Sequence, residues 1–356
     1  MRLGGCILVE VTLAATLATG VATGALYAKE AWRGVVGEAH AASAPGVGRP
    51  TGRLRAAVPP DHLPPTGYFL GIKDEILLLP LAGDIARARF NRGGSSISLR
   101  LDFLVGGRAA FKPDQTASGQ YPRMEIAAYR FDRLIGLNAV APAVPVQFRL
   151  EEVLGKLDES SRDIVPRILA EVPTDDAGLI AGELQWWIPV IKDAEIEGVP
   201  IDAPDGLRRW RRYMKVGEPE PYEARHLLPQ LSNMVVFDYL INNRDRWSGA
   251  NCKASPDQRT LYFMDHTLAF GVTLDADERL QATLAHVQKF SRSLVRRIRE
   301  VDAAEVRAAM THHTGPYERL LTDTEIDGVM HRRELLLAYV DDLVAEHGID
   351  SVLVYP

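Results

Sequence analysis

The stretch Asn242-Asn243-Arg244-Asp245-Arg246-Trp247-Ser248-Gly249-Ala250-Asn251 follows an apolar run with helical spacing and leads into a short strand-like run. Asp245 lies in its polar turn, and Asp265 follows 20 residues later, at the end of a strand predicted at residues 260–264. A turn between the two strand-like runs predicts a hairpin that brings Asn251 and Asp265 together. Two carboxylates and an amide oxygen suit Mg²⁺ or Mn²⁺. The stretch therefore predicts a metal site beside a carboxylate that can orient an attacking hydroxyl.

A lysine and a glutamate upstream fit the same chemistry. Lys112 ends a strand predicted at residues 108–112, after Gly106 and Gly107. Its stem can lie along apolar surface while its ammonium contacts a phosphate, although a lone strand lysine is more often a surface residue. Glu125 lies beside the apolar stripe of a helix predicted at residues 122–137. Burial of the Glu125 carboxylate without a partner would cost free energy, so Lys112 is its expected partner. A solvated Glu125 on the helix surface is the alternative.

A glycine pair precedes these residues. Gly93 and Gly94 lie in residues 91–96, which join two strand-like runs. Backbone amides of such a hairpin can bind phosphate oxygens, and an ordinary hairpin turn is the competing interpretation. The chain contains neither a GxxxxGK[ST] nor a GxGxxG motif, so a Walker loop and a Rossmann fingerprint are both excluded.

The order of the predicted elements indicates an α+β bilobal fold with a cleft between the lobes. An antiparallel, β-rich N-lobe with one helix is expected at residues 67–190, and an α-rich C-lobe at residues 191–356. Further N-lobe strands are predicted at residues 75–79, 95–103 and 140–150, and residues 179–190 form an apolar and aromatic run. Helices of the C-lobe are predicted at residues 232–242, 276–298, 303–311 and 323–346.

Composition narrows the function classes. Hydrophobic residues make up 46% of the 356 and charged residues 25%, which allows a real core. The net charge of −6 argues against a nucleic-acid partner, whose binding domains are usually basic. Cys6 and Cys252, the two cysteines, provide no disulfide framework, and the histidines show no spacing typical of a zinc site.

The N-terminus has the pattern of a targeting segment. Residues 1–30 contain an apolar run long enough for a membrane anchor or the core of a signal peptide, with a buried helix as the alternative. Residues 31–66 become rich in Ala, Pro and Gly and are expected to form a disordered linker. Either targeting interpretation places the globular part outside the cytoplasm, anchored to the membrane only through the N-terminal segment or secreted after its cleavage.

Three stretches, in the same order along the chain, resemble the secretory-pathway kinases, the family of the four-jointed protein and of the Golgi casein kinase with its xylose-kinase relatives. The matching stretches are Ala109-Ala110-Phe111-Lys112-Pro113, Glu125-Ile126-Ala127-Ala128-Tyr129-Arg130-Phe131-Asp132-Arg133-Leu134-Ile135-Gly136, and Phe237-Asp238-Tyr239-Leu240 with Asn243-Arg244-Asp245-Arg246 and Asp265-His266-Thr267-Leu268-Ala269-Phe270-Gly271. The resemblance covers residues 106–271 and implies a kinase fold.

By this resemblance, Lys112 and Glu125 form the pair that positions ATP, Asp245 is the catalytic aspartate, and Asp265 binds the metal. Trp187 falls in the segment where the hinge between the lobes contacts adenine through its backbone. The implied function is a metal-dependent kinase that transfers the γ-phosphoryl group of ATP to a protein Ser/Thr or to a sugar.

Two departures from the family pattern leave alternatives open. His266 follows Asp265 where the family usually has asparagine, and Asn251 lies six residues after Asp245, with Ala250 at the usual fifth position. A pseudokinase that binds nucleotide and acts as a scaffold is therefore one alternative. A phosphoinositide-type lipid kinase, which has a similar Asp-Arg catalytic loop, is another.

Overall fold

A computed structural model describes residues 67–116 and 121–356. The targeting segment predicted at residues 1–30 and the linker predicted at residues 31–66 lie outside the described residues. Among the helices of the described part, none is both long and apolar enough to cross a bilayer.

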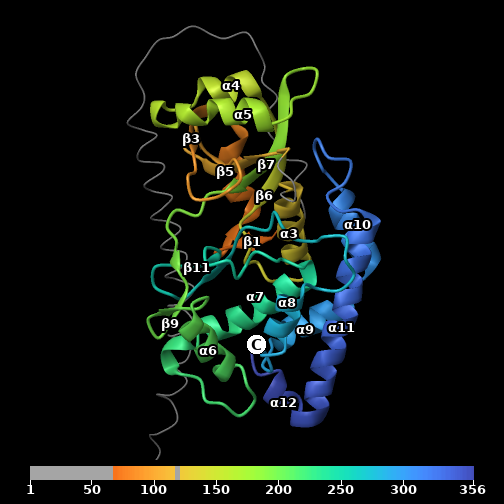
Figure 1. The fold of residues 1–356 in the computed structure, drawn as a ribbon. Coiled ribbons are helices and arrows are strands. Elements are labelled where there is room, and N and C mark those ends of the chain that lie inside the picture. Colours follow the sequence, from red (N-terminus) through yellow and green to blue (C-terminus); the bar gives the residue numbers. More distant parts are fainter. Residues whose placement is uncertain (1–66, 117–120) are drawn as a thin grey trace, which may run out of the picture.

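A five-stranded antiparallel sheet forms the first half of the structure (Figure 1). Its strands are β3 (Ile85–Phe90), β4 (Leu99–Phe103), β5 (Arg108–Pro113), β6 (Ala143–Arg149) and β7 (Leu179–Trp186). The order across the sheet is β3-β4-β5-β7-β6. Alternating apolar residues explain its buried face, since Leu99, Leu101 and Phe103 of β4 all lie inside. The strands predicted at residues 95–103, 108–112 and 140–150 are confirmed as β4, β5 and β6, with somewhat different limits.

Short helices surround the sheet. They are α2 (Asp74–Leu78), η2 (Leu79–Ala82), α4 (Leu150–Gly155), η3 (Glu159–Ile164) and α5 (Val165–Glu171), and a small hairpin of β1 (Tyr68–Phe69) and β2 (Ile72–Lys73) precedes them. The strand predicted at residues 75–79 is wrong, because this segment is α2 and the start of η2. The negative charges of Asp74 and Glu75 in the first turn interact favourably with the positive end of the helix dipole, which stabilises the helix. The prediction of one helix in this half is also wrong.

The helix predicted at residues 122–137 is confirmed as α3 (Arg123–Leu134). Gly136, with a φ of +75°, lies just beyond its end, in a conformation that glycine adopts at no steric cost. The buried residues of α3 belong to the same hydrophobic cluster as the C-terminal helices, not to the cluster beneath the sheet. This helix therefore connects the sheet to the helical half of the molecule.

Residues 187–191 lead from β7 into a second, three-stranded sheet of order β12-β11-β8. Its strands are β8 (Lys192–Asp193), β11 (Cys252–Ala254) and β12 (Leu261–Phe263), and β9 (Glu195–Ile196) and β10 (Val199–Pro200) form a separate hairpin. Strands β11 and β12 are the hairpin predicted from the sequence, with Cys252 opposite Phe263.

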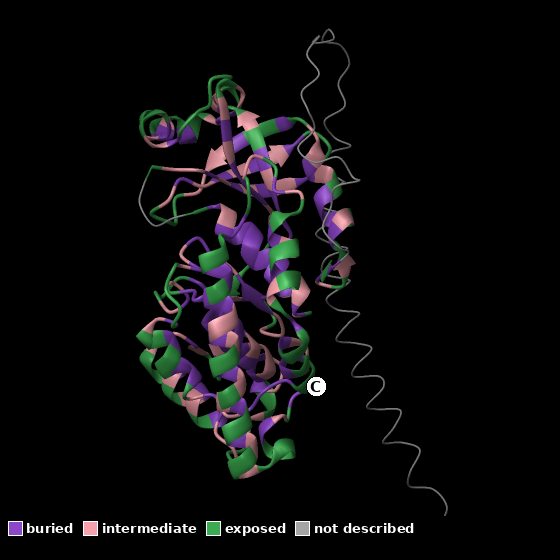
Figure 2. Ribbon diagram, turned by 90° about the vertical axis from the view of Figure 1, so that its right-hand side faces the viewer, coloured by how far each residue is buried: buried purple, intermediate pink, exposed green. Residues whose placement is uncertain are grey.

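The second half of the structure is mostly helical, and its buried residues lie along the inner faces of the helices (Figure 2). The helices are α6 (Pro204–Tyr213), η4 (Tyr222–Ala224), α7 (Leu227–Ile241), α8 (Glu278–Leu284), α9 (Arg292–Glu300), α10 (Ala303–Thr311), α11 (Asp323–His347) and α12 (Ile349–Val352). Capping boxes at Asp302 and Thr322 fix the starts of α10 and α11. The single helix predicted at residues 276–298 is wrong, because Ser291 caps a new helix there.

Candidate active site

Lys112 of β5 is the centre of a charged cluster between the two halves. Its Nζ lies 2.5 Å from Oε1 of Glu125 on α3 and 3.0 Å from Oδ1 of Asp265 beyond β12. Burial alone would lower the pKa of Lys112, but the charges of Asp265 and Glu125 outweigh it and raise that pKa. One ammonium thus connects three elements that are far apart in the sequence.

Glu125 is 1% exposed and holds two partners. Besides Lys112, it contacts His266, whose Nδ1 lies 3.0 Å from Glu125 Oε2. Burial would raise the pKa of Glu125, but the charge of Lys112 and the hydrogen bond from His266 lower it. Both oxygens of this buried carboxylate are therefore satisfied, and the ion pair expected between Lys112 and Glu125 is present.

Asp265 follows β12 directly and has a φ of +57°, in the left-handed region that non-glycine residues rarely adopt. Asn243 Nδ2 contacts the Asp265 carbonyl oxygen at 3.4 Å. The Asp265 side chain remains 41% exposed even though Lys112 holds it. Backbone strain of this kind concentrates at functional sites and persists where the surroundings enforce it.

Arg246 is the buried connector behind these residues. Its guanidinium pairs with both carboxylate oxygens of Asp238 on α7, and it donates to the carbonyl oxygens of Asn251 and Met264. Its Nη2 also lies 3.1 Å from Nε2 of His266. A guanidinium can only donate, so His266 Nε2 accepts and the ring proton on Nδ1 is directed to Glu125. A continuous polar chain therefore runs from Lys112 to α7.

Asp245 and Asn251 face each other at the turn after α7. Asn251 Nδ2 donates to Asp245 Oδ2 at 2.9 Å and to the Asp245 carbonyl oxygen at 3.1 Å. Within residues 67–116 and 121–356, no side chain or backbone group donates to the Asn251 amide oxygen. The Asp245 amide in turn contacts Asn243 Oδ1 at 3.3 Å. The hairpin places Asn251 next to Asp245 in spite of the extra residue between them.

Two predicted contacts with the nucleotide stay predictions. Gly93 and Gly94 lie in the exposed β3–β4 turn, where Arg92 reaches Asp163 of η3 at 2.8 Å, and no recorded contact within the described residues connects these glycines to Lys112. Trp187 lies in the connection between the sheets, but its amide already donates to the Arg108 carbonyl oxygen at 3.2 Å. Of its backbone groups, only the carbonyl is left for a base.

Glu183 of β7 is a member of this cluster that sequence reasoning missed. It lies directly opposite Lys112 in the β5–β7 register, so the two side chains share one face of the sheet. Glu183 is fully buried, and neither of its carboxylate oxygens has a hydrogen-bond partner among the residues that the structure describes. Burial first, and then the charge of Glu125, raise the pKa of Glu183 well above its ordinary value. The only sequence signal was a glutamate within an apolar strand.

Replacing Glu183 with glutamine is expected to stabilise the fold by on the order of 1 kcal/mol at pH 8, and by less at pH 5. Because the folded-state pKa is raised, the folded protein keeps a proton above pH ~4.3 that the unfolded chain releases. Stability of the parent chain therefore falls as pH rises from that value towards the folded-state pKa. Urea unfolding at both pH values measures the difference. Glu159→Gln, at an exposed position, is the control, and a Glu183→Gln effect that is equal at both pH values contradicts the prediction.

Known proteins resemble this chain at low sequence identity. No protein-family model matches it. Human glycosaminoglycan xylosylkinase is 24% identical over 312 residues, covering 76% of this chain and 75% of that protein. The mouse pseudokinase FAM20A is 23% identical and the human extracellular serine/threonine protein kinase FAM20C 22% identical, over 73% and 78% of this chain. The alignments span 56% of each of these two relatives.

Solved structures share the fold. The Golgi casein kinase superposes with a TM-score of 0.61 at 15% identity, covering 79% of this chain and 77% of that one. Hydra Fam20 with sugar gives 0.57 at 17% identity, covering 76% and 88%. A structure of the Golgi casein kinase with Mn and ADP bound gives 0.59. The kinase-like fold expected from the motifs is confirmed, and the chain is similar in sequence and in fold to members of the FAM20 family of secretory-pathway kinases.

Proposed function

We propose that this protein is a metal-dependent kinase that transfers the γ-phosphoryl group of ATP to a hydroxyl group. The observation that carries the proposal is the Lys112 ammonium held between Glu125 and Asp265. A cation fixed between two carboxylates, one of them 41% exposed, is preorganised to bind phosphates together with a metal ion. The relatives that are kinases by name support this assignment.

The residues present fit Mg²⁺ or Mn²⁺. Asp265 Oδ1 contacts Lys112, whereas its second carboxylate oxygen has no hydrogen-bond partner in the part of the chain that the structure describes. Asn251 directs its NH₂ group to Asp245, which leaves its amide oxygen for a cation. No cluster of three or more His, Cys, Asp or Glu side chains suited to a metal exists among the described residues. This agrees with a Mg²⁺-type site, in which one or two protein ligands act together with substrate phosphates. The bound ion would neutralise phosphate charge.

Asp245 is assigned to the acceptor hydroxyl. Its carboxylate lies in a turn immediately beyond a buried helix, and Asn251 and the local backbone fix its orientation. Most of the expected catalysis is positioning and electrostatic stabilisation. The acceptor class proposed is a sugar or a protein Ser/Thr, since relatives include a xylosylkinase and a serine/threonine kinase. An extracytoplasmic location is proposed from the N-terminal sequence and from the relative described as extracellular.

A nucleotide-binding scaffold is the second candidate. The identity to the mouse pseudokinase, 23%, lies between those to the two kinases, 24% and 22%, so overall similarity does not separate the functions. The residues favour turnover, because Lys112, Glu125, Asp245 and Asp265 are all present and three of them are in direct contact. A scaffold has no need of Asp245.

The test is transfer of radiolabelled phosphate from γ-labelled ATP, with Mn²⁺ or Mg²⁺, to a panel of peptide, sugar and lipid acceptors. We expect labelling of a sugar or peptide. In parallel, the melting temperature of the purified chain is expected to rise with ATP and Mn²⁺, and Lys112→Met should abolish this rise. A melting shift without transfer to any acceptor would support the scaffold instead. Exclusive labelling of lipid would support a lipid kinase.

A further inference from the structure

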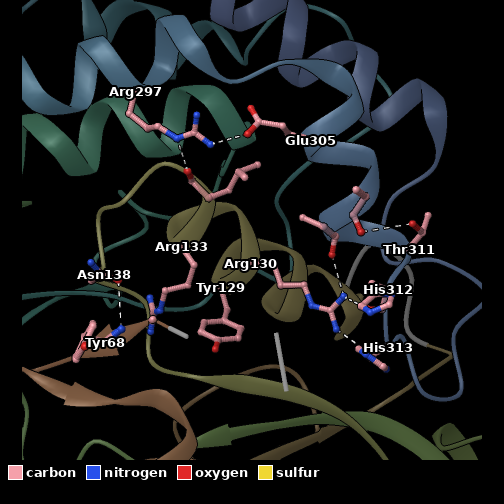
Figure 3. A pocket seen from close by; sticks show the side chains of 14 residues that line it. Tyr68, Tyr129, Arg130, Arg133, Asn138, Arg297, Glu305, Thr311, His312 and His313 are labelled. Carbon is pink, nitrogen blue, oxygen red and sulfur yellow. Dashed lines mark hydrogen bonds and ion pairs between the residues drawn. The ribbon is translucent and has the colours of Figure 1, made fainter. Parts of the chain in front are cut away.

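A cavity lies on the far side of α3 from the candidate active site. It has a volume of about 770 Å³ and is bordered by α3, the start of the described chain and the end of α10 (Figure 3). Glu125 and Arg130 are five residues apart on α3, so they project from nearly opposite faces of the helix. The cavity is therefore separate from the charged cluster at Lys112, and its size is typical of sites that hold small organic ligands.

The charged side chains around this cavity are mostly cationic. Three arginines, Arg130, Arg133 and Arg297, line it together with one acid, Glu305. Arg133 is paired with Asp74, outside the lining, at 2.7 Å, and Arg297 with Glu305 at 3.0 Å. Of these three arginines, Arg130 alone has no carboxylate partner in the described part of the chain.

Arg130 is 6% exposed and contacts only carbonyl oxygens at the end of α10. They belong to Ala309, His312 and His313, and Figure 3 shows the guanidinium directed towards this loop. The dipole of α10 offsets part of the charge. Burial still lowers the pKa of Arg130 to about 10, and its Nε has no hydrogen-bond partner. A buried cation with a donor to spare is costly unless an anion joins it.

We propose that this cavity binds a small organic ligand that carries a tetrahedral oxyanion, a phosphate or sulfate ester, with the oxyanion on Arg130. Nη1 donates to two carbonyl oxygens and Nη2 to a third, so Nε and the second hydrogen of Nη2 are the donors left for a ligand. A planar carboxylate would use both of its oxygens on these two donors, whereas a tetrahedral group has a further oxygen that can face the rim near His312. Because an inorganic ion would fill little of about 770 Å³, the ligand has an organic body.

The N-terminal part of this chain has the wrong charge to be the occupant. Residues 40–66 contain Arg49, Arg53 and Arg55 against Asp61. This basic segment does not complement an unpaired arginine. A separate anionic molecule therefore fits the cavity better, and this inference does not depend on the proposed kinase activity.

Calorimetric titration of the purified full-length chain tests the proposal, with glucose 6-phosphate and glucose 6-sulfate as probes and glucose and glucuronate as controls. We expect saturable binding of at least one ester, and binding of glucose and glucuronate at least about tenfold weaker. The two ester arms distinguish phosphate from sulfate. Absence of binding by both esters, or equal binding of glucuronate, overturns the proposed ligand class.

Variants locate the site. Arg130→Gln is expected to weaken ester binding at least about tenfold, but it also removes contacts that hold the end of α10. Ala308→Trp, at an exposed position of the lining, fills the cavity without touching Arg130 and should weaken binding to a similar extent. Ala345→Trp, at an exposed position of α11 outside the lining, is the matched control and should bind as the parent does. Unchanged affinity in Ala308→Trp overturns the location.

Discussion

Asp245→Asn is expected to lower the rate of phosphoryl transfer by at least about 10³-fold while leaving nucleotide affinity within about threefold. The asparagine keeps the size of the side chain and an oxygen that can accept from Asn251, so the turn should persist. It loses the negative charge that we propose to orient the acceptor hydroxyl and accept its proton. Single-turnover transfer with the acceptor found by labelling measures the rate, and a melting shift with ATP and Mn²⁺ measures binding.

The matched control is Asp176→Asn, at an exposed aspartate in the turn before β7, which should transfer at the parental rate. Asp265→Asn provides a second comparison. It removes the proposed metal ligand and the partner of Lys112 together, so both the rate and the melting shift should be lost. An Asp245→Asn protein that transfers phosphate within tenfold of the parent rate would remove Asp245 from the proposed role.

The sequence predicted best where structure is locally encoded. Helix α10 begins and ends as predicted, because Asp302 and Glu305 form a capping box that any chain with this spacing can make. The hairpin after Asn251 was equally readable from its turn residues. Residues 75–79 misled because four of them are apolar in a row, and such a short run does not distinguish a strand from a helix.

Only part of the candidate site could be predicted from the sequence. Lys112, Glu125 and Asp265 lie within the stretches that resemble the kinase family, so contacts between them could be expected from the sequence. Glu183 is 71 residues from Lys112 in the sequence and meets it only through the pairing of β5 with β7. No local pattern specifies which two strands become neighbours, so its importance emerges only from the folded sheet.

His266 is a second residue whose contacts could not be predicted from the sequence. In the sequence it is a departure from the family pattern, at the position after Asp265. In the structure its ring is fully buried and joins Glu125 to Arg246, at 3.0 Å and 3.1 Å. The histidine at this position therefore has a hydrogen-bond partner at each of its two ring nitrogens. This arrangement connects the lysine cluster to α7.

Arg246→Met is expected to destabilise the protein by about 3–5 kcal/mol, the largest effect on stability predicted here. Arg246 and Asp238 are both fully buried, and removing the guanidinium leaves the Asp238 carboxylate, among the described residues, with only the hydrogen bond from Asn243 Nδ2. The substitution also deprives the carbonyl oxygens of Asn251 and Met264 of a donor. Urea unfolding at pH 7 measures the loss.

Arg244→Met, two residues earlier and exposed, is the matched control and should change stability by less than about 0.5 kcal/mol. Arg246→Lys keeps the charge, but one ammonium cannot replace a planar fork that serves Asp238 and two carbonyl oxygens, so an intermediate loss is expected. The double variant Arg246→Met with Asp238→Asn should be less destabilised than the sum of the single variants, because it no longer leaves a charge buried alone. A loss below about 1 kcal/mol in Arg246→Met would show that water or a neighbouring group compensates Asp238. The polar chain from Lys112 to α7 would then not be what holds Asp265 and Asn251 in place.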